Sequence, residues 1–176
     1  MLFRSKIALP DLCEYATGLI FFPQDEKERN FCKGVFKDAL REERLNLLGW
    51  RSVPVDNTEI CKAAKDTQPV IEQIFIASAT KRGGSANNFG GKNQIAFERK
   101  LFVVRKIIEN KIRASRLKEK TFFYITNLSS RTLSYKGLLM PHQLERFFLD
   151  LRDGDKRVLF AWCIPAIPPT PFLPGI

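Results

Sequence analysis

The pattern that most constrains the fold is a long stripe of apolar residues at helical spacing between Gln94 and about Arg116. A helix with one apolar face has to bury that face against another element. Shorter apolar segments on both sides of it are typical of strands, so we expect the helix to cover one face of a sheet. The stripe consists of Phe97, Leu101, Val104, Ile108 and Ile112.

A second helix is predicted from residue 26 to about residue 44. Asp25 is its expected cap, with Glu28 as the capping-box partner. Pro141 fits the first turn of a short third helix that ends near Phe148. Strands are predicted at 15–22, 48–55, 70–77 and 156–161, and a hairpin from 121–126 to 131–136 through residues 127–130. Pro54 places the second strand at an edge or a strand end.

The resulting order, β-α-β-β-α-β-β-α-β, predicts an α+β or α/β domain and names no function. At 176 residues the chain fits one domain. It has no apolar run long enough for a transmembrane helix and no signal-peptide pattern. The widely spaced cysteines indicate reduced thiols, and we expect a cytoplasmic protein with no membrane partner.

The charge is unevenly distributed. The net charge is +10, and residues 99–136 hold eleven Lys and Arg against two Glu, which gives +9. A basic stripe can bind phosphate backbones, so a non-catalytic nucleic-acid-binding module is the alternative function. We favour a solvated or docking face, because no nucleic-acid motif accompanies the charge.

Four blocks, in this order, carry a family resemblance. They resemble the glutamine amidotransferase domain of the glutamate synthase large subunit, and the likeness runs from about Phe3 to Ala161. The blocks are LGWRSVPVDN at 48–57, PVIEQIFI at 69–76, FERKLFVVRK at 97–106, and FFYI at 122–125 continuing as LSSRTLSYKGLL at 128–139.

The resemblance implies an N-terminal-nucleophile hydrolase of α+β class, here an incomplete four-layer αββα sandwich. In that family a cysteine at the mature N-terminus attacks the glutamine amide, and its α-amino group acts as the base. An arginine holds the glutamine carboxylate, and an Asn-Gly pair forms the oxyanion hole. The ammonia then joins 2-oxoglutarate at an FMN site, and reduction yields glutamate. An iron–sulfur cluster serves the parent enzyme, and the sequence leaves ferredoxin and NAD(P)H open as its electron donor.

None of the family's functional residues maps onto this chain. We therefore expect no catalytic, cofactor-binding or metal-binding residue in it, and no glutaminase activity from the chain alone. The nucleophile would lie before Met1. The expected partners are glutamine, as the substrate of the parent domain, and the remainder of glutamate synthase. A pseudoenzyme subunit that associates with an intact synthase is a further alternative.

The last residues depart from the family. Residues 161–176 carry no charge and hold five of the ten prolines. Inserting one T into the codon of Trp162 shifts the reading frame. In the shifted frame, codons compatible with Ala161 to Gly175 can encode the family stretch, Ala-Leu-Val-His-Ser-Arg-Tyr-Ser-Thr-Asn-Thr-Phe-Pro-Ser-Trp. We therefore expect a truncated amidotransferase domain over 1–161 and a disordered, out-of-frame tail over 162–176, which sequencing the gene would test.

Several residues invite functional readings that their context disfavours. No cysteine here can offer a free α-amino group, and a single histidine without a partner is a poor site. The acidic pairs sit in turn-forming contexts, and the glycine-rich segment at 81–92 lacks phosphate-loop spacing. We expect a hairpin turn with a strand-facing arginine at 129–131. The residues concerned are Cys13, Cys32, Cys61 and Cys163, His142, Asp56 and Asn57, and Asp150 and Asp153.

Overall fold

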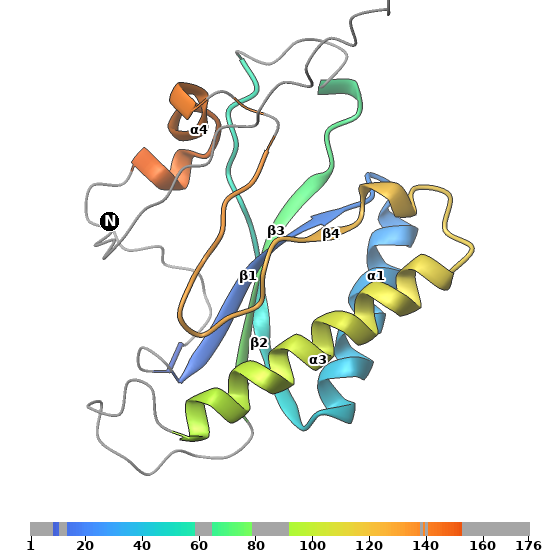
Figure 1. The fold of residues 1–176 in the computed structure, drawn as a ribbon. Coiled ribbons are helices and arrows are strands. Elements are labelled where there is room, and N and C mark those ends of the chain that lie inside the picture. The colour runs from blue at the N-terminus through green and yellow to red at the C-terminus, as the bar shows by residue number, and fades with distance from the viewer. Residues whose placement is uncertain are drawn as a thin grey trace, which may run out of the picture.

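A computed structural model describes residues 9–10, 14–58, 65–78, 92–137, 139 and 141–152. These residues form one antiparallel sheet with two long helices and a short helical segment (Figure 1). In chain order the elements are β1 (Tyr15–Phe22), α1 (Glu26–Glu42), β2 (Leu45–Ser52), β3 (Val70–Ser78), α3 (Lys92–Ala114), η1 (Lys120–Phe122), β4 (Tyr124–Ile125), α4 (Pro141–Phe147) and η2 (Leu149–Arg152).

The strand order in the sheet is β2-β3-β1-β4, and every pairing is antiparallel. The longest pairing joins β1 to β3 from Tyr15↔Ala77 to Phe22↔Val70. Side chains alternate between the two faces of a strand, so each strand divides its residues between two environments. The predicted strand at 48–55 begins and ends earlier, at Leu45 and Ser52, which leaves Pro54 beyond the strand end.

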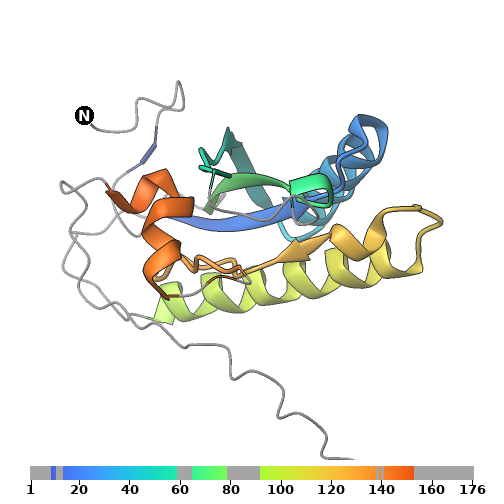
Figure 2. The same cartoon turned by 90° about the horizontal axis from the view of Figure 1, so that it is seen from above.

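One face of the sheet carries the main hydrophobic core. Helices α1 and α3 contact each other and share this core with alternate residues of the strands (Figure 1, Figure 2). The predicted stripe on α3 is buried over its whole length. The core consists of Ala16, Ile20, Phe22, Cys32, Phe36, Ala39, Leu40, Leu45, Ile74, Ile76, Phe97, Leu101, Val104, Ile108, Ile112, Ile125 and Leu128.

An ion pair joins α1 to β3 beside this core. Lys33 of α1 reaches Glu72 of β3 at 2.7 Å, and its ammonium lies 5.4 Å from the ring centroid of Trp50. Glu72 is buried, and Lys33 supplies the partner that a buried polar group requires.

The opposite face of the sheet meets α4 and η2. A smaller apolar cluster joins Leu19 of β1, Ile71 of β3 and Val53 to Phe147 and Phe148. In Figure 1, α4 lies apart from α1 and α3. The described residues therefore form a mixed helix and sheet fold with an open antiparallel sheet, as an α+β domain of this type requires. The four-layer arrangement stays a prediction, because the described residues form one sheet only.

Half of the predicted capping box is present. The Asp25 carboxylate caps α1 by accepting from Glu28 N at 2.8 Å. The Glu28 carboxylate does not return to Asp25, but accepts from the backbone N–H groups of Lys118 and Glu119 at 2.8 and 2.9 Å. Glu119 in turn accepts from the backbone of Gln24 and Asp25. This exchange ties the start of α1 to the segment that follows α3, because each carboxylate satisfies N–H groups of the other segment.

The predicted hairpin between 121–126 and 131–136 is wrong. Residues 131–136 form no strand, and the segment after β4 continues along β1 instead. Thr126 N donates to Leu19 O at 3.0 Å, and Thr17 and Ser129 exchange two backbone hydrogen bonds. β1 thus supplies the donors and acceptors that the hairpin would have supplied. Gly18 permits this course, since a Cβ there would stand 1.9 Å from the backbone oxygen of Asn127.

The remaining sequence predictions have mixed outcomes. The strand at 15–22, the strand at 70–77, the two long helices and the short helix at Pro141 are confirmed to within two residues at each end. The strand predicted at 156–161 and the tail at 162–176 lie outside the described residues.

Candidate functional site

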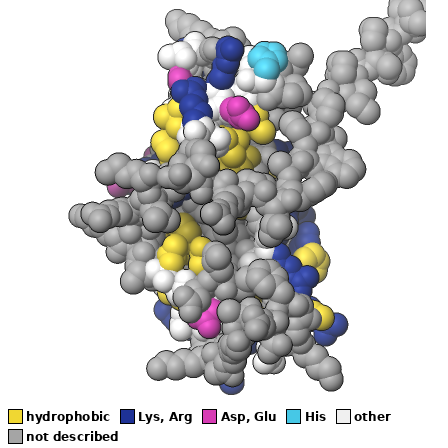
Figure 3. Space-filling view, turned by 90° about the vertical axis from the view of Figure 1, so that its left-hand side faces the viewer, with side chains coloured by type: hydrophobic (Ala, Val, Ile, Leu, Met, Phe, Trp, Pro, Cys, Tyr) yellow, Lys and Arg dark blue, Asp and Glu magenta, His cyan; other side chains and the backbone are white. Residues whose placement is uncertain are grey.

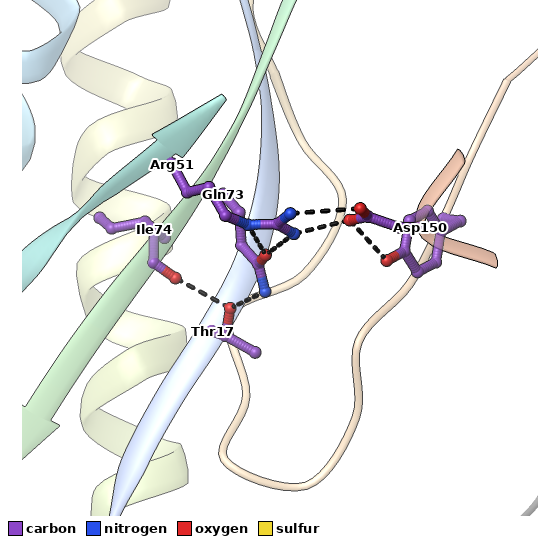
Figure 4. A network of polar contacts seen from close by, with 6 residues as sticks. Thr17, Arg51, Gln73, Ile74 and Asp150 are labelled. Carbon is purple, nitrogen blue, oxygen red and sulfur yellow. Dashed lines mark hydrogen bonds and ion pairs between the residues drawn. The ribbon is translucent and has the colours of Figure 1, made fainter. Parts of the chain in front are cut away.

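The most buried polar cluster of the described residues lies on the sheet face opposite α1 and α3 (Figure 4). At its centre, the Arg51 guanidinium of β2 forms a bidentate pair with the Asp150 carboxylate of η2. Nη1 donates to Oδ1 at 3.2 Å and Nη2 donates to Oδ2 at 2.6 Å. The Asp150 side chain is fully buried, and that of Arg51 is 14% exposed. The geometry is that of a charge-assisted fork.

Neighbouring side chains extend this cluster across the sheet. Gln73 of β3 accepts from Nε of Arg51 at 3.0 Å and also from its Nη2. The Gln73 amide nitrogen donates to Thr17 Oγ1 at 2.8 Å, and this hydroxyl donates to Ile74 O at 2.9 Å. The hydrogen bonds thus connect three adjacent strands, β2, β3 and β1, with η2.

Tyr135 completes the cluster from the segment before α4. Its hydroxyl lies 3.4 Å from Asp150 Oδ2, and its ring stacks edge-on against Phe148 at 5.0 Å between centroids. Burial, with the nearby Asp150 charge as a smaller cause, raises the pKa of Tyr135 above its usual value. The phenol is therefore neutral at physiological pH and acts as a hydrogen-bond donor.

The cluster positions chain segments and offers no reactive group. Nε, Nη1 and Nη2 of Arg51 all donate to Asp150 or Gln73, so this arginine is committed to holding η2 on the sheet. Asp150 was expected to serve a cap or a loop contact; it contacts Tyr135 in the segment before α4, but its main partner is the strand arginine Arg51, which was not expected. Its companion in that expectation, Asp153, lies outside the described residues. The signal in the sequence was Arg51, the one charged residue of β2.

A second polar cluster joins the Ser129-Ser130-Arg131 turn to α3. The Glu98 carboxylate accepts from Ser130 N at 2.7 Å, Ser130 Oγ at 2.6 Å and Ser129 Oγ at 3.3 Å. Arg131 was expected to face a strand. Instead, its Nη2 donates to Gln94 Oε1 of α3 at 3.5 Å. The turn is therefore held by a helix carboxylate in place of a hairpin partner.

Next to this turn, the outer side of α3 carries a shallow groove of about 580 Å³. Three of the side chains that line it are apolar and exposed, and Glu98 is already engaged with the two serines. The lining residues are Ile95, Glu98, Arg99, Phe102, Val103 and Arg131.

The other residues singled out in the sequence have structural surroundings. Cys32 is fully buried within α1, and burial, assisted by the Glu28 charge, raises its pKa to about 12. Asp56 accepts from the backbone and hydroxyl of Thr58, which lowers its pKa, and this is the expected turn contact. The chain's histidine, His142, is exposed on α4 (Figure 3). Cys13, Cys61 and Cys163, and the loop at 81–91, lie outside the described residues.

Among the described residues, no three His, Cys, Asp or Glu side chains gather as a metal site would require. Cys32 is the one described cysteine, and its buried, protonated thiol does not fit an iron–sulfur ligand set. No described helix is long and apolar enough to cross a membrane.

Comparison with known proteins decides the family. The family described as "Glutamine amidotransferases class-II" matches residues 1–163. The chain belongs to the class-II glutamine amidotransferases.

Three relatives show where this amidotransferase sequence occurs. The chain is 37% identical over 148 residues to the glutamate synthase [NADPH] large chain of Bacillus subtilis, covering 84% of this chain and 9% of that protein. It is 34% identical over 150 residues to a ferredoxin-dependent glutamate synthase of rice, covering 85% of this chain and 8% of the relative. The yeast glutamate synthase [NADH] is 31% identical over 150 residues, covering 83% of this chain and 6% of the relative. The chain therefore spans less than a tenth of the length of these relatives.

The four sequence blocks of the amidotransferase resemblance meet in the structure. The first lies largely in β2 and the second in β3, which pair side by side. The third forms the middle of α3 and buries Leu101 and Val104 in the main core. The fourth contains β4, the turn held by Glu98 and the Tyr135 contact to Asp150. The blocks thus contain much of the framework, whereas β1, α1 and Asp150 lie outside them.

Proposed function

We propose that this chain is part of the glutaminase domain of a glutamate synthase. In the parent enzyme, glutamine hydrolysis supplies ammonia for the reductive formation of glutamate from 2-oxoglutarate. Within that domain the chain contributes framework: one sheet, the helices that cover it, and the Arg51–Asp150 pair that fixes the η2 segment. The observation that carries the proposal is the family match over residues 1–163, together with relatives that are all glutamate synthases.

The chain alone does not hydrolyse glutamine under this proposal. A nucleophilic cysteine needs an accessible thiol with a low pKa, or an adjacent base. Cys32 has neither property, because it is fully buried in α1 and its pKa is raised to about 12. The family's electron-transfer groups, FMN and the iron–sulfur cluster, belong to other parts of the parent enzyme. Ferredoxin and NAD(P)H remain open as the reductant, because both kinds of relative occur.

Measurement of ammonia release from glutamine tests the inactivity directly. The purified chain is incubated with glutamine, and ammonia is followed with a coupled enzyme assay. We expect no release above a buffer blank. Glutamine turnover by the pure chain, lost when Cys32 is replaced by Ser, would contradict the assignment of a framework role.

A chimera tests the framework role itself. The segment of the Bacillus subtilis large chain that aligns with this chain is replaced by residues 14–152, and the hybrid is assayed for glutaminase activity. We expect a folded hybrid to release ammonia from glutamine. A hybrid with the circular dichroism and gel-filtration behaviour of the relative, but without glutaminase activity, would contradict the proposal.

Two narrower proposals accompany this function. The tail at 162–176 arises from a deletion of one nucleotide in the Trp162 codon. Sequencing the gene tests this, and a gene in which no other reading frame encodes the family stretch would refute it. The location is the cytoplasm, which a fluorescent fusion in the source cells would test.

A further inference from the structure

The outer side of α3 has the composition of an interface. Phe102 is 61% exposed, and Ile95 and Val103 are 43% and 41% exposed. All three lie on the helix side opposite the buried stripe, so the middle of α3 is apolar on both sides. A surface helix of a free-standing domain normally places polar residues there. Clustered apolar side chains beside a groove are typical of a surface that another segment covers.

The groove is lined by two arginines and one glutamate, so its net charge is positive. Arg99 and Arg131 both line it, and no carboxylate of the described residues forms an ion pair with either. The acidic side chain in the lining, Glu98, accepts three hydrogen bonds from Ser129 and Ser130. Lys106 lies one turn further along α3, with its ammonium 5.8 Å from the Phe102 ring centroid and paired with the Glu109 carboxylate at 3.1 Å. Lys and Arg side chains lie next to exposed hydrophobic ones at the right-hand edge of Figure 3.

We propose that this groove binds an acidic segment of the parent glutamate synthase, outside the described residues, whose carboxylates pair with Arg99 and Arg131. A large apolar side chain of that segment packs against Phe102, Ile95 and Val103. This proposal rests on the proposed function, because that function supplies the partner. Apolar contact ringed by complementary charge is the usual anatomy of a specific interface.

A second copy of this chain is a poor occupant. An isologous contact would place Arg99 and Arg131 of one copy against the same positive groove of the other. The net charge of +10 adds repulsion between copies. Charge complementarity therefore favours an acidic partner segment over self-association.

The test uses overlapping peptides that tile the Bacillus subtilis large chain, probed with the full-length chain studied here. We expect the bound peptides to carry net negative charge and at least one large apolar side chain. The dissociation constant of the best peptide, measured by fluorescence anisotropy, should rise at least about tenfold for Phe102→Asp and for the double variant Arg99→Glu and Arg131→Glu. Added salt should weaken binding of the acidic peptide as well.

Matched controls separate the groove from general effects. Phe31→Asp changes an exposed phenylalanine of α1, and Arg113→Glu reverses an exposed charge at the end of α3. Both should leave the dissociation constant within about twofold of the unmodified chain. Circular dichroism and thermal melts verify that each variant is folded. If the double charge reversal unfolds the chain, the single variants Arg99→Gln and Arg131→Gln are measured in its place.

The outcomes distinguish the two proposals. The docking proposal would be overturned if the bound peptides were basic or neutral, or if the dissociation constant were unchanged in the groove variants. Either result would leave the proposed function intact. A dimer that depends on Phe102 would overturn the docking proposal too. The groove could instead bind acidic peptides from an unrelated library, through Phe102 and Arg99, and bind no peptide of the synthase. That result would exclude the synthase as the partner and count against the proposed function.

Discussion

Removal of the Asp150 carboxylate is expected to destabilise the fold more than any other change of a single charged residue among those described. In Asp150→Ala, the guanidinium of Arg51 keeps Gln73 but loses both carboxylate oxygens, at 3.2 and 2.6 Å. The Asp150 side chain is fully buried and that of Arg51 is 14% exposed, so water cannot readily replace the lost acceptor. Breaking a buried pair in this way costs about 3–5 kcal/mol.

That cost is large for a domain of ordinary stability, which unfolds with about 5–15 kcal/mol. Urea denaturation followed by circular dichroism gives the free energy of unfolding of each variant. Arg51→Ala alone should cost a similar amount, because it leaves the Asp150 carboxylate buried without its guanidinium partner. The double variant should cost less than the sum of the single ones, by roughly 2 kcal/mol, because each single change already removes the same interaction.

Two outcomes would refute this reasoning. One is an Asp150→Ala variant within about 1 kcal/mol of the unmodified chain, which would match an exposed ion pair. The other is strict additivity of the two single changes, which would show that the guanidinium and carboxylate do not interact in solution. Asp150→Glu serves as a control, since it keeps the charge and displaces the carboxylate by one methylene group.

Three further outcomes are expected. Gly18→Ala should lower stability by about 1–3 kcal/mol in urea melts, because its Cβ would meet the Asn127 backbone oxygen at 1.9 Å; an unchanged midpoint would contradict that contact. Glu98→Ala should cost about 2 kcal/mol and increase amide exchange at Ser130, whose N–H loses its acceptor; unchanged exchange there would contradict the role of Glu98. Cys32 should resist alkylation at neutral pH, and rapid modification of the folded chain would contradict this. Its pKa rises from 9.0 in the unfolded chain to about 12 in the folded one, so its contribution to stability should be complete below pH 9 and lost between pH 9 and 12. A Cys32→Ala variant that loses stability equally over this alkaline range would contradict that assignment.

Local sequence patterns were sufficient for the elements that bury one clear face. The stripe from Phe97 to Ile112 predicted α3 because helical periodicity and burial agree over the whole segment. The strand at Tyr15–Phe22 was equally clear, since it is a short apolar run that ends before Pro23. In both cases the information lies within a few neighbouring residues.

Tertiary partners decided what the sequence left undetermined. Residues 131–136 have the composition of a strand, but the free edge of β1 takes the preceding segment as its partner, and Gly18 makes room for it. Similarly, Glu28 has the spacing of a capping-box residue, yet its carboxylate binds the backbone at Lys118 and Glu119, far along the chain. Neither choice is visible in local composition.

The candidate site was missed for the same reason. Arg51 and Asp150 are 99 residues apart, and nothing near either one identifies the other as its partner. The acidic residues around Asp150 resemble those of an exposed turn, so its burial and its pair with Arg51 were not predicted. Family resemblance predicted the chemistry of the parent enzyme, whereas only the three-dimensional arrangement shows the framework role of this pair.

The glutaminase activity of the chimera tests the central claim most directly. Residues 14–152 of this chain replace the aligned segment of the Bacillus subtilis large chain, and ammonia release from glutamine is measured in the purified hybrid. If the chain is amidotransferase framework, the folded hybrid hydrolyses glutamine, and Asp150→Ala within it lowers the melting temperature. A hybrid that folds and melts like the relative but releases no ammonia would contradict the claim.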